Sequence, residues 1–358
     1  MVATVSPKGL YILLISVHGL IRGHNLELGR DADTGGQTKY VVELAKSLAR
    51  QVAVERIDLV TRLIVDEAVS IDYKAPVEQL SANSRIVRIK AGPEEYIPKE
   101  QLWPHMDSFA DNLCIWLSEQ PRLPDVIHTH YADAGYVGVR LANHTGLPLV
   151  HTGHSLGRDK YSRLLAVGMG IEQIEERYHM QARISAEEDI LSCAELVITS
   201  TRNEIESQYE LYDYYTPEKM AVIPPGINLE QFHPVIQGQP AISQAFQSKL
   251  SLFLRDPAKP MILALSRPDE RKNIVSLLEA FGQNKSLQKL ANLVIVAGNR
   301  DDIRELNDGV QSVLTELLWV IDVYELYGLV ALPKHHSAED VPDIYRYAAA
   351  SKGVFVNP

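Results

Sequence analysis

Two adjacent glycines, Gly35 and Gly36, lie between a strand-like run and a helix-like run of the chain. Asp33, Thr34 and Gln37 surround them, so the turn is polar. Because glycine has no Cβ, a ligand can approach this backbone closely, and the unpaired N–H groups at the start of the helix then face it. An anionic group is the expected occupant. The spacing matches neither GxGxxG nor Walker A, and a tight turn without a ligand is the alternative.

A second polar cluster follows the apolar run 147–152, in the sequence His151-Thr-Gly-His-Ser-Leu-Gly-Arg-Asp-Lys160. We expect one loop to bring four side chains into one region: His154, Ser155, Arg158 and Lys160. A histidine, a hydroxyl and cations suit a phosphorylated polar substrate. Arg183 begins a predicted helix and would add a second phosphate contact, although Arg183 and Glu187 also have the spacing of an ordinary helical ion pair. For His154 alone, a structural histidine is the alternative.

A third cluster, Ser266-Arg-Pro-Asp-Glu-Arg-Lys-Asn273, follows a strand-like run in the second half of the chain and opens the next helix. Arg267 and Lys272 would then lie beside a helix N-terminus, a geometry that suits a diphosphate. A solvated charged turn is the alternative interpretation.

The histidines outside these clusters do not predict a metal site. His128 and His130 alternate along a strand, and we interpret them as pointing to opposite faces of the sheet. His335 and His336 are neighbours in a loop, with no acidic or cysteine cluster to complete a site. The segment Gly153-His-Ser-Leu-Gly157 has the GxSxG spacing of serine hydrolases, but we interpret Ser155 as part of the polar cluster that suits a phosphorylated substrate. We therefore expect neither a bound metal nor a nucleophilic serine.

The elements that must position these residues alternate between short apolar strands and amphipathic helices. In the first half, the strand candidates are 11–17, 57–64, 85–90, 125–131, 147–152, 195–200 and 220–224. The helix candidates are 38–50, 104–119, 133–145 and 180–193. This alternation predicts a doubly wound α/β sheet with parallel strands and right-handed crossovers. The glycine turn, the segment His128–Tyr131 and the segment after 152 all follow strands, and active residues gather beyond such strand ends.

The pattern breaks at Pro224-Pro-Gly226 and restarts near residue 260. The strand candidates of the second half are 261–265, 292–297, 326–330 and 353–356. The helix candidates are 273–282, 308–320 and 341–350. We predict two domains, 1–235 and 236–358, with a hinge near 225–250. The sequence stops directly after a predicted strand, so we expect the second domain to be truncated.

Length and charge limit the possible partners. The chain has 358 residues and a net charge of −11, with a sequence pI of about 5.6. A nucleic-acid-binding protein would show a clustered basic excess, so we expect no nucleic acid as partner. Cys114 and Cys193 are too far apart in sequence to suggest a disulfide framework and are expected as buried core thiols. No signal peptide and no membrane-spanning run is evident, which favours a cytoplasmic location.

Six segments carry a specific resemblance to one family. They are His18–Leu44, Ile97–His105, His151–Lys160, Ile198–Ile205, Val222–Ile227 and the pair Pro333–His336 with Asp340–Arg346. In these segments the chain resembles the sucrose-phosphate synthases, retaining glycosyltransferases of family 4. The resemblance implies the GT-B fold, in which two Rossmann-like domains face a cleft. The resemblance covers the chain from about residue 10 to the last residue.

The resemblance implies an activity and its substrates. It is the transfer of glucose from UDP-glucose to fructose 6-phosphate with retention at the anomeric carbon, which gives sucrose 6-phosphate and UDP. ADP-glucose is the alternative donor. No cofactor or divalent metal is expected, and the leaving phosphate would help to deprotonate the acceptor hydroxyl.

The resemblance also implies roles for individual residues. The residues expected to contact the acceptor are Gly36, Gln37, Tyr131, Ser155, Lys160 and Arg183, with Lys160 and Arg183 on its phosphate. His154 matches the catalytic histidine beside the donor glucose. Gly35, Arg267 and Lys272 are expected on the donor side, where the two cations neutralise the diphosphate of UDP.

The chain departs from the family pattern at three places. The loop Gly92-Pro-Glu-Glu-Tyr96 lacks the cation that the family carries there, and Ala182 stands where a second arginine is expected before Arg183. Family members continue beyond the final Asn-Pro with a Glu-Pro-Phe-Gly segment and a glutamate seven residues after the first. These bind the donor glucose and ribose, so their absence from this sequence puts donor binding in doubt.

Three other functions remain open at this level. The first is a catalytically weak or inactive sugar-phosphate-binding fragment. The second is a sucrose synthase that uses free fructose, which Lys160 together with Arg183 argues against. A nicotinamide-dependent dehydrogenase is more distant, because the GxGxxG fingerprint with its following acidic residue is missing. Oligomeric state and regulation are not indicated by the sequence.

Overall fold

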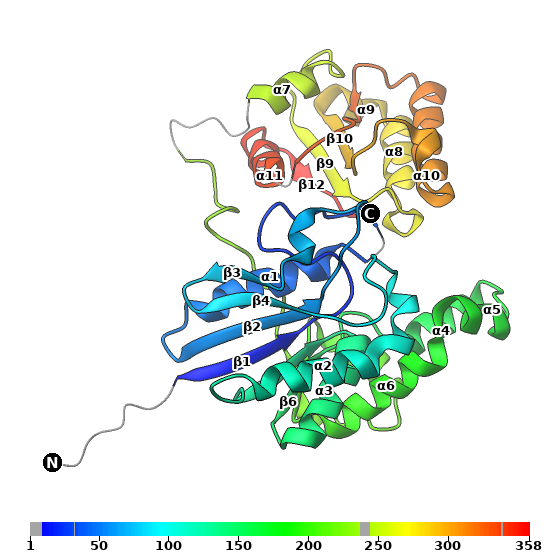
Figure 1. The fold of residues 1–358 in the computed structure, drawn as a ribbon. Helices are drawn as coiled ribbons and strands as arrows, with labels where there is room; N and C mark the ends of the chain where they lie inside the picture. The colour runs from blue at the N-terminus through cyan, green and yellow to red at the C-terminus, as the bar shows by residue number, and fades with distance from the viewer. Residues whose placement is uncertain (1–8, 32, 237–243, 338) are drawn as a thin grey trace. The chain divides into compact units, whose positions relative to one another are not determined.

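The computed structural model describes residues 9–31, 33–236, 244–337 and 339–358. The chain divides into two compact units, Met1–Gly226 and Ile227–Pro358. The division lies earlier in the chain than the predicted boundary between residues 235 and 236. Each unit contains a mainly parallel sheet with helices on both faces (Figure 1). The predicted α/β class is therefore confirmed for both.

The first unit is built on an eight-stranded sheet with the order β3-β4-β2-β1-β5-β6-β7-β8. Its strands are β1 (Leu10–Ile15), β2 (Val54–Arg62), β3 (Val77–Ser81), β4 (Ser84–Ile89), β5 (Val126–His130), β6 (Leu149–Thr152), β7 (Leu196–Thr199) and β8 (Met220–Val222). All neighbours pair in parallel except β3, which is antiparallel to β4. β3 was not predicted from the sequence; it is an edge strand in which no residue is buried.

Alternation along β1 explains why both faces of this sheet are covered. Ile12 and Leu14 pack with α1 (Gly36–Ala49) on one face. Leu13 and Ile15 pack with α2 (Met106–Ser118) and α3 (Ala132–Thr145) on the other. Successive side chains of a strand point to opposite faces, so a continuous apolar run supplies both cores.

The strand order places a topological switch point between β1 and β5, which are parallel neighbours. From this point the chain runs outward through β2 and β4 on one side and through β6, β7 and β8 on the other. The loop that ends in Gly35 follows β1, and Tyr131 follows β5. Ligands of doubly wound sheets bind beyond the carboxyl ends of the strands at such a point.

The second unit has a four-stranded parallel sheet with the order β11-β10-β9-β12. Its strands are β9 (Met261–Ser266), β10 (Asn292–Ala297), β11 (Val330–Ala331) and β12 (Val354–Phe355). One face packs against α8 (Ile274–Gln283) and α10 (Asp308–Val323). The other packs against α7 (Gln244–Ser251) and α11 (Asp340–Ala350).

Some elements differ from their prediction. The strand expected at 326–330 is a two-residue strand, β11, because Leu326 packs into the core before the chain becomes extended. Four helices were missed: α4 (Gly157–Ala166), α5 (Ile171–Tyr178), α7 and α9 (Lys285–Leu290). α4 and α5 bury one residue each, so their sequences lack the apolar stripe that signals a helix. The predicted 180–193 helix is α6 (Met180–Cys193).

The two cysteines are half-buried, not fully buried as expected, and both pack against the core of the first unit. Among the described residues, no helix is long and apolar enough to cross a membrane.

Candidate active site

The glycine turn begins α1 and borders open space. Gly35 is the N-cap of the helix, and no side chain caps this end. A Cβ added to Gly35 or to Gly36 would meet no atom within 4 Å. Neither glycine has a positive φ, so the backbone conformation does not require glycine. The absence of a side chain keeps the space over the first helical N–H groups clear, as an approaching ligand would need.

The rest of the loop is anchored to the protein. The Asp33 carboxylate accepts a hydrogen bond from the Lys99 backbone N–H (2.8 Å) and forms an ion pair with the Lys99 ammonium. Although burial opposes its charge, these contacts lower the pKa of Asp33. Gln37 donates its side-chain N–H to the Ser16 hydroxyl (3.2 Å) and to the His130 carbonyl (3.4 Å). Gln37 thus connects the turn to the ends of β1 and β5.

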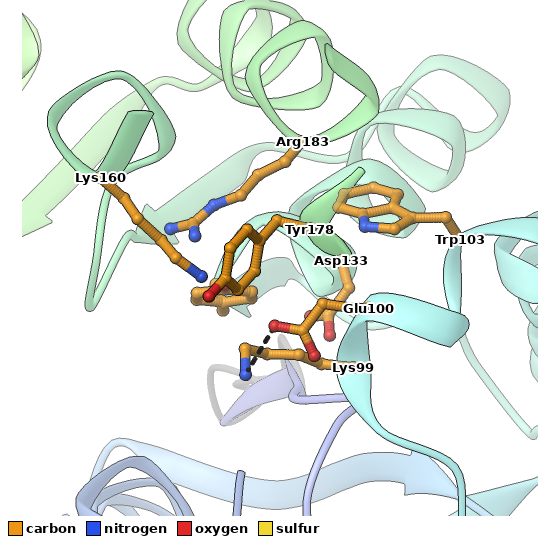
Figure 2. A pocket seen from close by; sticks show the side chains of 8 residues that line it. Lys99, Glu100, Trp103, Asp133, Lys160, Tyr178 and Arg183 are labelled. Carbon is orange, nitrogen blue, oxygen red and sulfur yellow. Dashed lines mark ion pairs between the residues drawn. The ribbon is translucent and has the colours of Figure 1, made fainter. Parts of the chain in front are cut away.

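A pocket in the first unit gathers side chains from separated segments (Figure 2). It contains about 260 Å³ of space, including its opening to solvent. Its lining residues are Lys99, Glu100, Trp103, Tyr131, Asp133, Lys160, Tyr178 and Arg183. The structure thus brings together three of the predicted acceptor residues: Tyr131, Lys160 and Arg183. The other five were not predicted as site residues. For three of them, the resemblance of segment Ile97–His105 was the available signal.

Arg183 is held by a buried network. Its side chain is 3% exposed, and its Nε donates to a carboxylate oxygen of Glu187 (3.1 Å). Its Nη2 donates to the carbonyl (2.8 Å) and hydroxyl (3.2 Å) of Ser155. The guanidinium carbon lies 4.6 Å from the Tyr131 ring centre, in a cation–π contact. The helical ion pair with Glu187 is therefore present, and Arg183 also lines the pocket, while its phosphate contact stays a prediction.

The buried Glu187 carboxylate holds the Arg183 side chain in place. This carboxylate accepts the Gly157 N–H at the start of α4 (2.9 Å) and the Tyr212 hydroxyl. Burial raises the pKa of Glu187, against the opposing effect of Arg183. The same carboxylate thus fixes Arg183 and the start of the helix that carries Lys160.

Within the part of the chain that the structure describes, Lys160 is the pocket cation without a carboxylate partner. Among the described residues its ammonium forms no ion pair, and it lies 3.8 Å from the centre of the Tyr178 ring. Burial and the nearby Arg183 guanidinium lower the pKa of Lys160 to about 8. Lys99 differs, because its ion pairs with Asp33 and Glu100 outweigh burial and raise the pKa of Lys99. Figure 2 shows Lys160 and Arg183 pointing into the same space.

The histidines at the ends of β5 and β6 form a cluster. The rings of His128 and His130 have centres 4.3 Å apart, so these residues lie on the same face of the sheet. The predicted opposite orientation is wrong, because residues two apart on a strand share a face. His130 Nδ1 lies 3.0 Å from His154 Nε2. His151 Nδ1 is within 2.9 Å of the Thr129 hydroxyl.

Burial lowers the pKa of His128, His130 and His151. The packed surroundings of its ring, and the neighbours His18 and His128, also lower the pKa of His154. Despite its many histidines, the part of the chain that the structure describes contains no group of three or more side chains arranged to hold a metal ion.

The predicted loop cluster is only partly one site. Lys160 lines the pocket, and Ser155 reaches it through Arg183. Arg158 does not, because it forms ion pairs with Glu188 (2.5 Å) and Asp213 (3.4 Å). The reason is that α4 begins at Gly157, so that Arg158 and Lys160 lie on a helix and not on one loop.

In the second unit, Arg267 follows β9 directly, and Lys272 ends a short turn, Glu270–Lys272, that leads into α8. Within the described residues neither side chain forms a hydrogen bond or ion pair, and Arg267 is exposed. β9 pairs with β10 on one side and with β12 on the other, so the switch point of this sheet lies beside β9. The positions therefore have the predicted relation to the strand end and to the helix N-terminus.

Two Rossmann-like units in one chain agree with the GT-B fold that the resemblance implies, and the pocket of the first unit lies at the switch point of its sheet. The family profile that matches the chain, over residues 2–244, is described as the sucrose synthase first GT-B domain. The chain belongs to this GT-B sucrose synthase family.

The similar proteins within this family are sucrose-phosphate synthases. The chain is 46% identical to sucrose-phosphate synthase 4 of Arabidopsis thaliana, with 99% of the chain and 39% of that protein aligned. It is 45% identical to the sucrose-phosphate synthase of Zea mays, with 98% and 39% aligned. The solved sucrose-phosphate synthase of Thermosynechococcus elongatus matches with a TM-score of 0.67 and 26% identity, over 95% of this chain and 74% of that one. The chain thus spans about two fifths of the length of these curated relatives.

Proposed function

We propose that this chain has the activity of a sucrose-phosphate synthase. It transfers glucose from UDP-glucose to fructose 6-phosphate with retention and yields sucrose 6-phosphate and UDP. The bond between the anomeric carbon and the UDP oxygen breaks, and a bond to the acceptor oxygen forms on the same face of the sugar. The acceptor hydroxyl gives its proton to the departing phosphate. The names of the curated relatives support this proposal.

The observation that carries the proposal is the pocket around Lys160. Lys160 and Arg183 point into one space, and the ammonium of Lys160 has no carboxylate partner among the described residues. A phosphate dianion would supply that missing partner, whereas the uncharged hydroxyl of free fructose would not. This favours fructose 6-phosphate over fructose as the acceptor. Tyr131 and Ser155 complete the proposed acceptor site, the first as a lining residue and the second through its bonds to Arg183.

The reacting groups are assigned to the neighbouring strand ends. The open space over Gly36 and the side chain of Gln37 suit the acceptor and the transferred sugar. His154, exposed beside His130, is proposed as the catalytic residue at the donor glucose. On the donor side, Gly35 leaves room for the sugar nucleotide. Arg267 and Lys272 would neutralise the diphosphate as it leaves, which fixed cations do without reorganisation.

The proposal also covers the cofactor requirement, the cellular location and the choice of donor. The two donor-side cations replace a divalent ion, so no metal or other cofactor is required, and full activity in excess chelator is the expected result. The enzyme acts on small molecules in the cytoplasm, without nucleic acid or membrane. UDP-glucose is the proposed donor, and its comparison with ADP-glucose at equal concentration tests this choice.

Calorimetric titration of the purified chain with fructose 6-phosphate and with fructose tests the acceptor. A charge-assisted phosphate contact predicts binding of fructose roughly 10- to 100-fold weaker. Lys160→Ala should remove most of this preference. Lys90→Ala is the matched control, because the Lys90 side chain is 75% exposed and paired only distantly with Glu94. This variant should leave the preference for fructose 6-phosphate unchanged. Equal binding of the two sugars would favour a sucrose synthase.

Product analysis tests the reaction. Incubation with UDP-glucose and fructose 6-phosphate should yield sucrose 6-phosphate with the α configuration retained at the glucosyl carbon. If the chain binds fructose 6-phosphate but neither binds UDP nor forms product, the alternative of a catalytically weak or inactive sugar-phosphate-binding fragment is correct for this polypeptide.

A further inference from the structure

His130 and His154 form a hydrogen-bonded pair at the ends of β5 and β6. The two ring nitrogens, His130 Nδ1 and His154 Nε2, are 3.0 Å apart, and the ring planes are tilted by 35°. His130 is fully buried, whereas His154 is exposed. Among the described residues, this is the hydrogen bond that orients the His154 ring. Tyr40 adds an edge contact, with ring centres 5.1 Å apart.

We propose that His130 is a positioning residue that holds His154 in the tautomer with its proton on Nδ1. His130 does this by donating its own Nδ1–H to Nε2 of His154. Nδ1–H of His154 is then the group left to donate a hydrogen bond to a ligand oxygen. The inference deepens the proposed function, because it rests on the assignment of His154 to the donor sugar.

The number of protons in the pair limits the possible arrangements. Burial and the neighbouring histidines lower the pKa of both His130 and His154, so near neutral pH each ring carries one proton. A bond between two ring nitrogens needs one N–H and one lone pair. Only two arrangements are therefore possible, with His130 or with His154 as the donor.

The surroundings of His130 decide between them. Its other ring nitrogen, Nε2, is buried and has no hydrogen-bond partner. If His154 were the donor, the proton of His130 would lie on Nε2, as a buried N–H without an acceptor. If His130 is the donor, Nε2 carries only an unused lone pair. Orphaned N–H groups are the rarer of the two in folded proteins, so donation from His130 is favoured.

The backbone conformation of His154 explains why its hydrogen bond to His130 matters. His154 has a φ of +58°, an uncommon conformation for a residue with a side chain. The preceding Gly153 lies against Tyr209, whose hydroxyl would be 2.4 Å from an added Cβ. Packing thus fixes where the His154 backbone is. The direction of its exposed ring depends on His130, as the orientation of a metal-ligating histidine depends on its hydrogen-bond partner.

The direct test is nitrogen NMR of the full chain labelled with ¹⁵N at histidine. The two ring nitrogens of a neutral histidine give separate signals for the protonated and the unprotonated atom. His154→Gln assigns the signals of His154. We expect Nδ1 of His154 to be the protonated atom near neutral pH. Protonation at Nε2 would refute the proposal, whatever the activity of the chain.

Two variants of His130 separate positioning from packing. The amide nitrogen of His130→Asn reaches the place of Nδ1 and can still donate, whereas His130→Leu fills the space without a donor. We expect His130→Leu to shift His154 to the Nε2–H tautomer and His130→Asn to preserve Nδ1–H. For the transfer to fructose 6-phosphate, His130→Leu should lower kcat about 10- to 100-fold with little change in KM, and His130→Asn should recover most of it.

These measurements distinguish failure of the inference about His130 from failure of the proposed function. If neither wild type nor variants form sucrose 6-phosphate, the activity is wrong, and the tautomer still decides this inference. If both variants lose kcat equally while the His154 tautomer stays unchanged, His130 has only a packing role and the proposal is overturned.

Discussion

The proton on Lys160 should control acceptor binding between pH 7 and 9. Burial and Arg183 lower the pKa of Lys160 to about 8 in the free protein. A bound phosphate dianion stabilises the protonated ammonium, so the pKa of Lys160 rises on binding. Binding of fructose 6-phosphate must therefore be accompanied by proton uptake, and its affinity must fall as the pH rises through 8.

The expected size follows from the fraction of free protein that carries this proton. Roughly nine tenths of Lys160 is protonated at pH 7 and roughly one tenth at pH 9, so affinity should fall about tenfold across this window. At pH 8, binding should take up about half a proton. The phosphate group itself changes charge near pH 6, below the window.

Other groups of the pocket should not contribute. The ion pairs of Lys99 with Asp33 and Glu100 raise the pKa of Lys99, and burial raises the pKa of Tyr131. Arg183 stays charged throughout. The decline in affinity should therefore belong to Lys160.

Calorimetry in two buffers of different ionisation enthalpy measures the proton uptake directly. Lys160→Arg keeps a charge at every pH in the window, so its affinity should be constant and its proton uptake close to zero. If the wild type takes up no proton at pH 8, or if Lys160→Arg retains the same pH dependence, the reasoning about this pocket is wrong.

Three further substitutions test other parts of the molecule. Glu187→Gln leaves a buried guanidinium without a counter-charge and should lower the free energy of unfolding in urea by about 3 kcal/mol. The exposed Glu176→Gln is the control and should change the free energy of unfolding by less than about 0.5 kcal/mol. Equal effects of the two substitutions would contradict the buried network around Arg183. Gly36→Ala should leave thermal stability unchanged or slightly higher, because the added methyl meets open space, while calorimetry shows weaker binding of fructose 6-phosphate; undiminished binding would place the acceptor elsewhere. Arg267→Ala should weaken UDP binding roughly 10- to 100-fold without changing the affinity for fructose 6-phosphate, and unchanged UDP binding would remove this residue from the donor side.

The sequence predicted the sheet elements well because they are long and apolar on both faces. The strands near β1, β2, β4 and β5 and the helices α1, α2 and α3 lie within a few residues of their predicted positions. Elements that bury little were missed, since periodicity reports burial and not hydrogen bonding. α4, which carries Lys160, is the example that affected the site, because its absence from the prediction placed Arg158 in the wrong surroundings.

The candidate site was predicted where residue type and strand position agreed. Tyr131, Lys160 and Arg183 come from three segments, and their common position beyond the strand ends brings them to one pocket. Lys99 was missed because it lies in a short turn, Lys99–Gln101, that has no periodic signal. Sequence spacing also cannot show that Asp33 is its partner, 66 residues earlier in the chain.

The pairing of Lys99 with Asp33 links the two parts of the candidate site. Lys99 lines the same pocket as Lys160 and Arg183, and Asp33 precedes the glycine turn by two residues. An anion in the pocket would compete with Asp33 for the Lys99 ammonium. The backbone N–H of Lys99 would still hold the Asp33 carboxylate, since this second bond does not involve the side chain. We therefore expect the loop to keep its anchor when an anion draws the Lys99 ammonium away, so that anion binding and the position of Gly35 and Gly36 would depend on the same pair of residues.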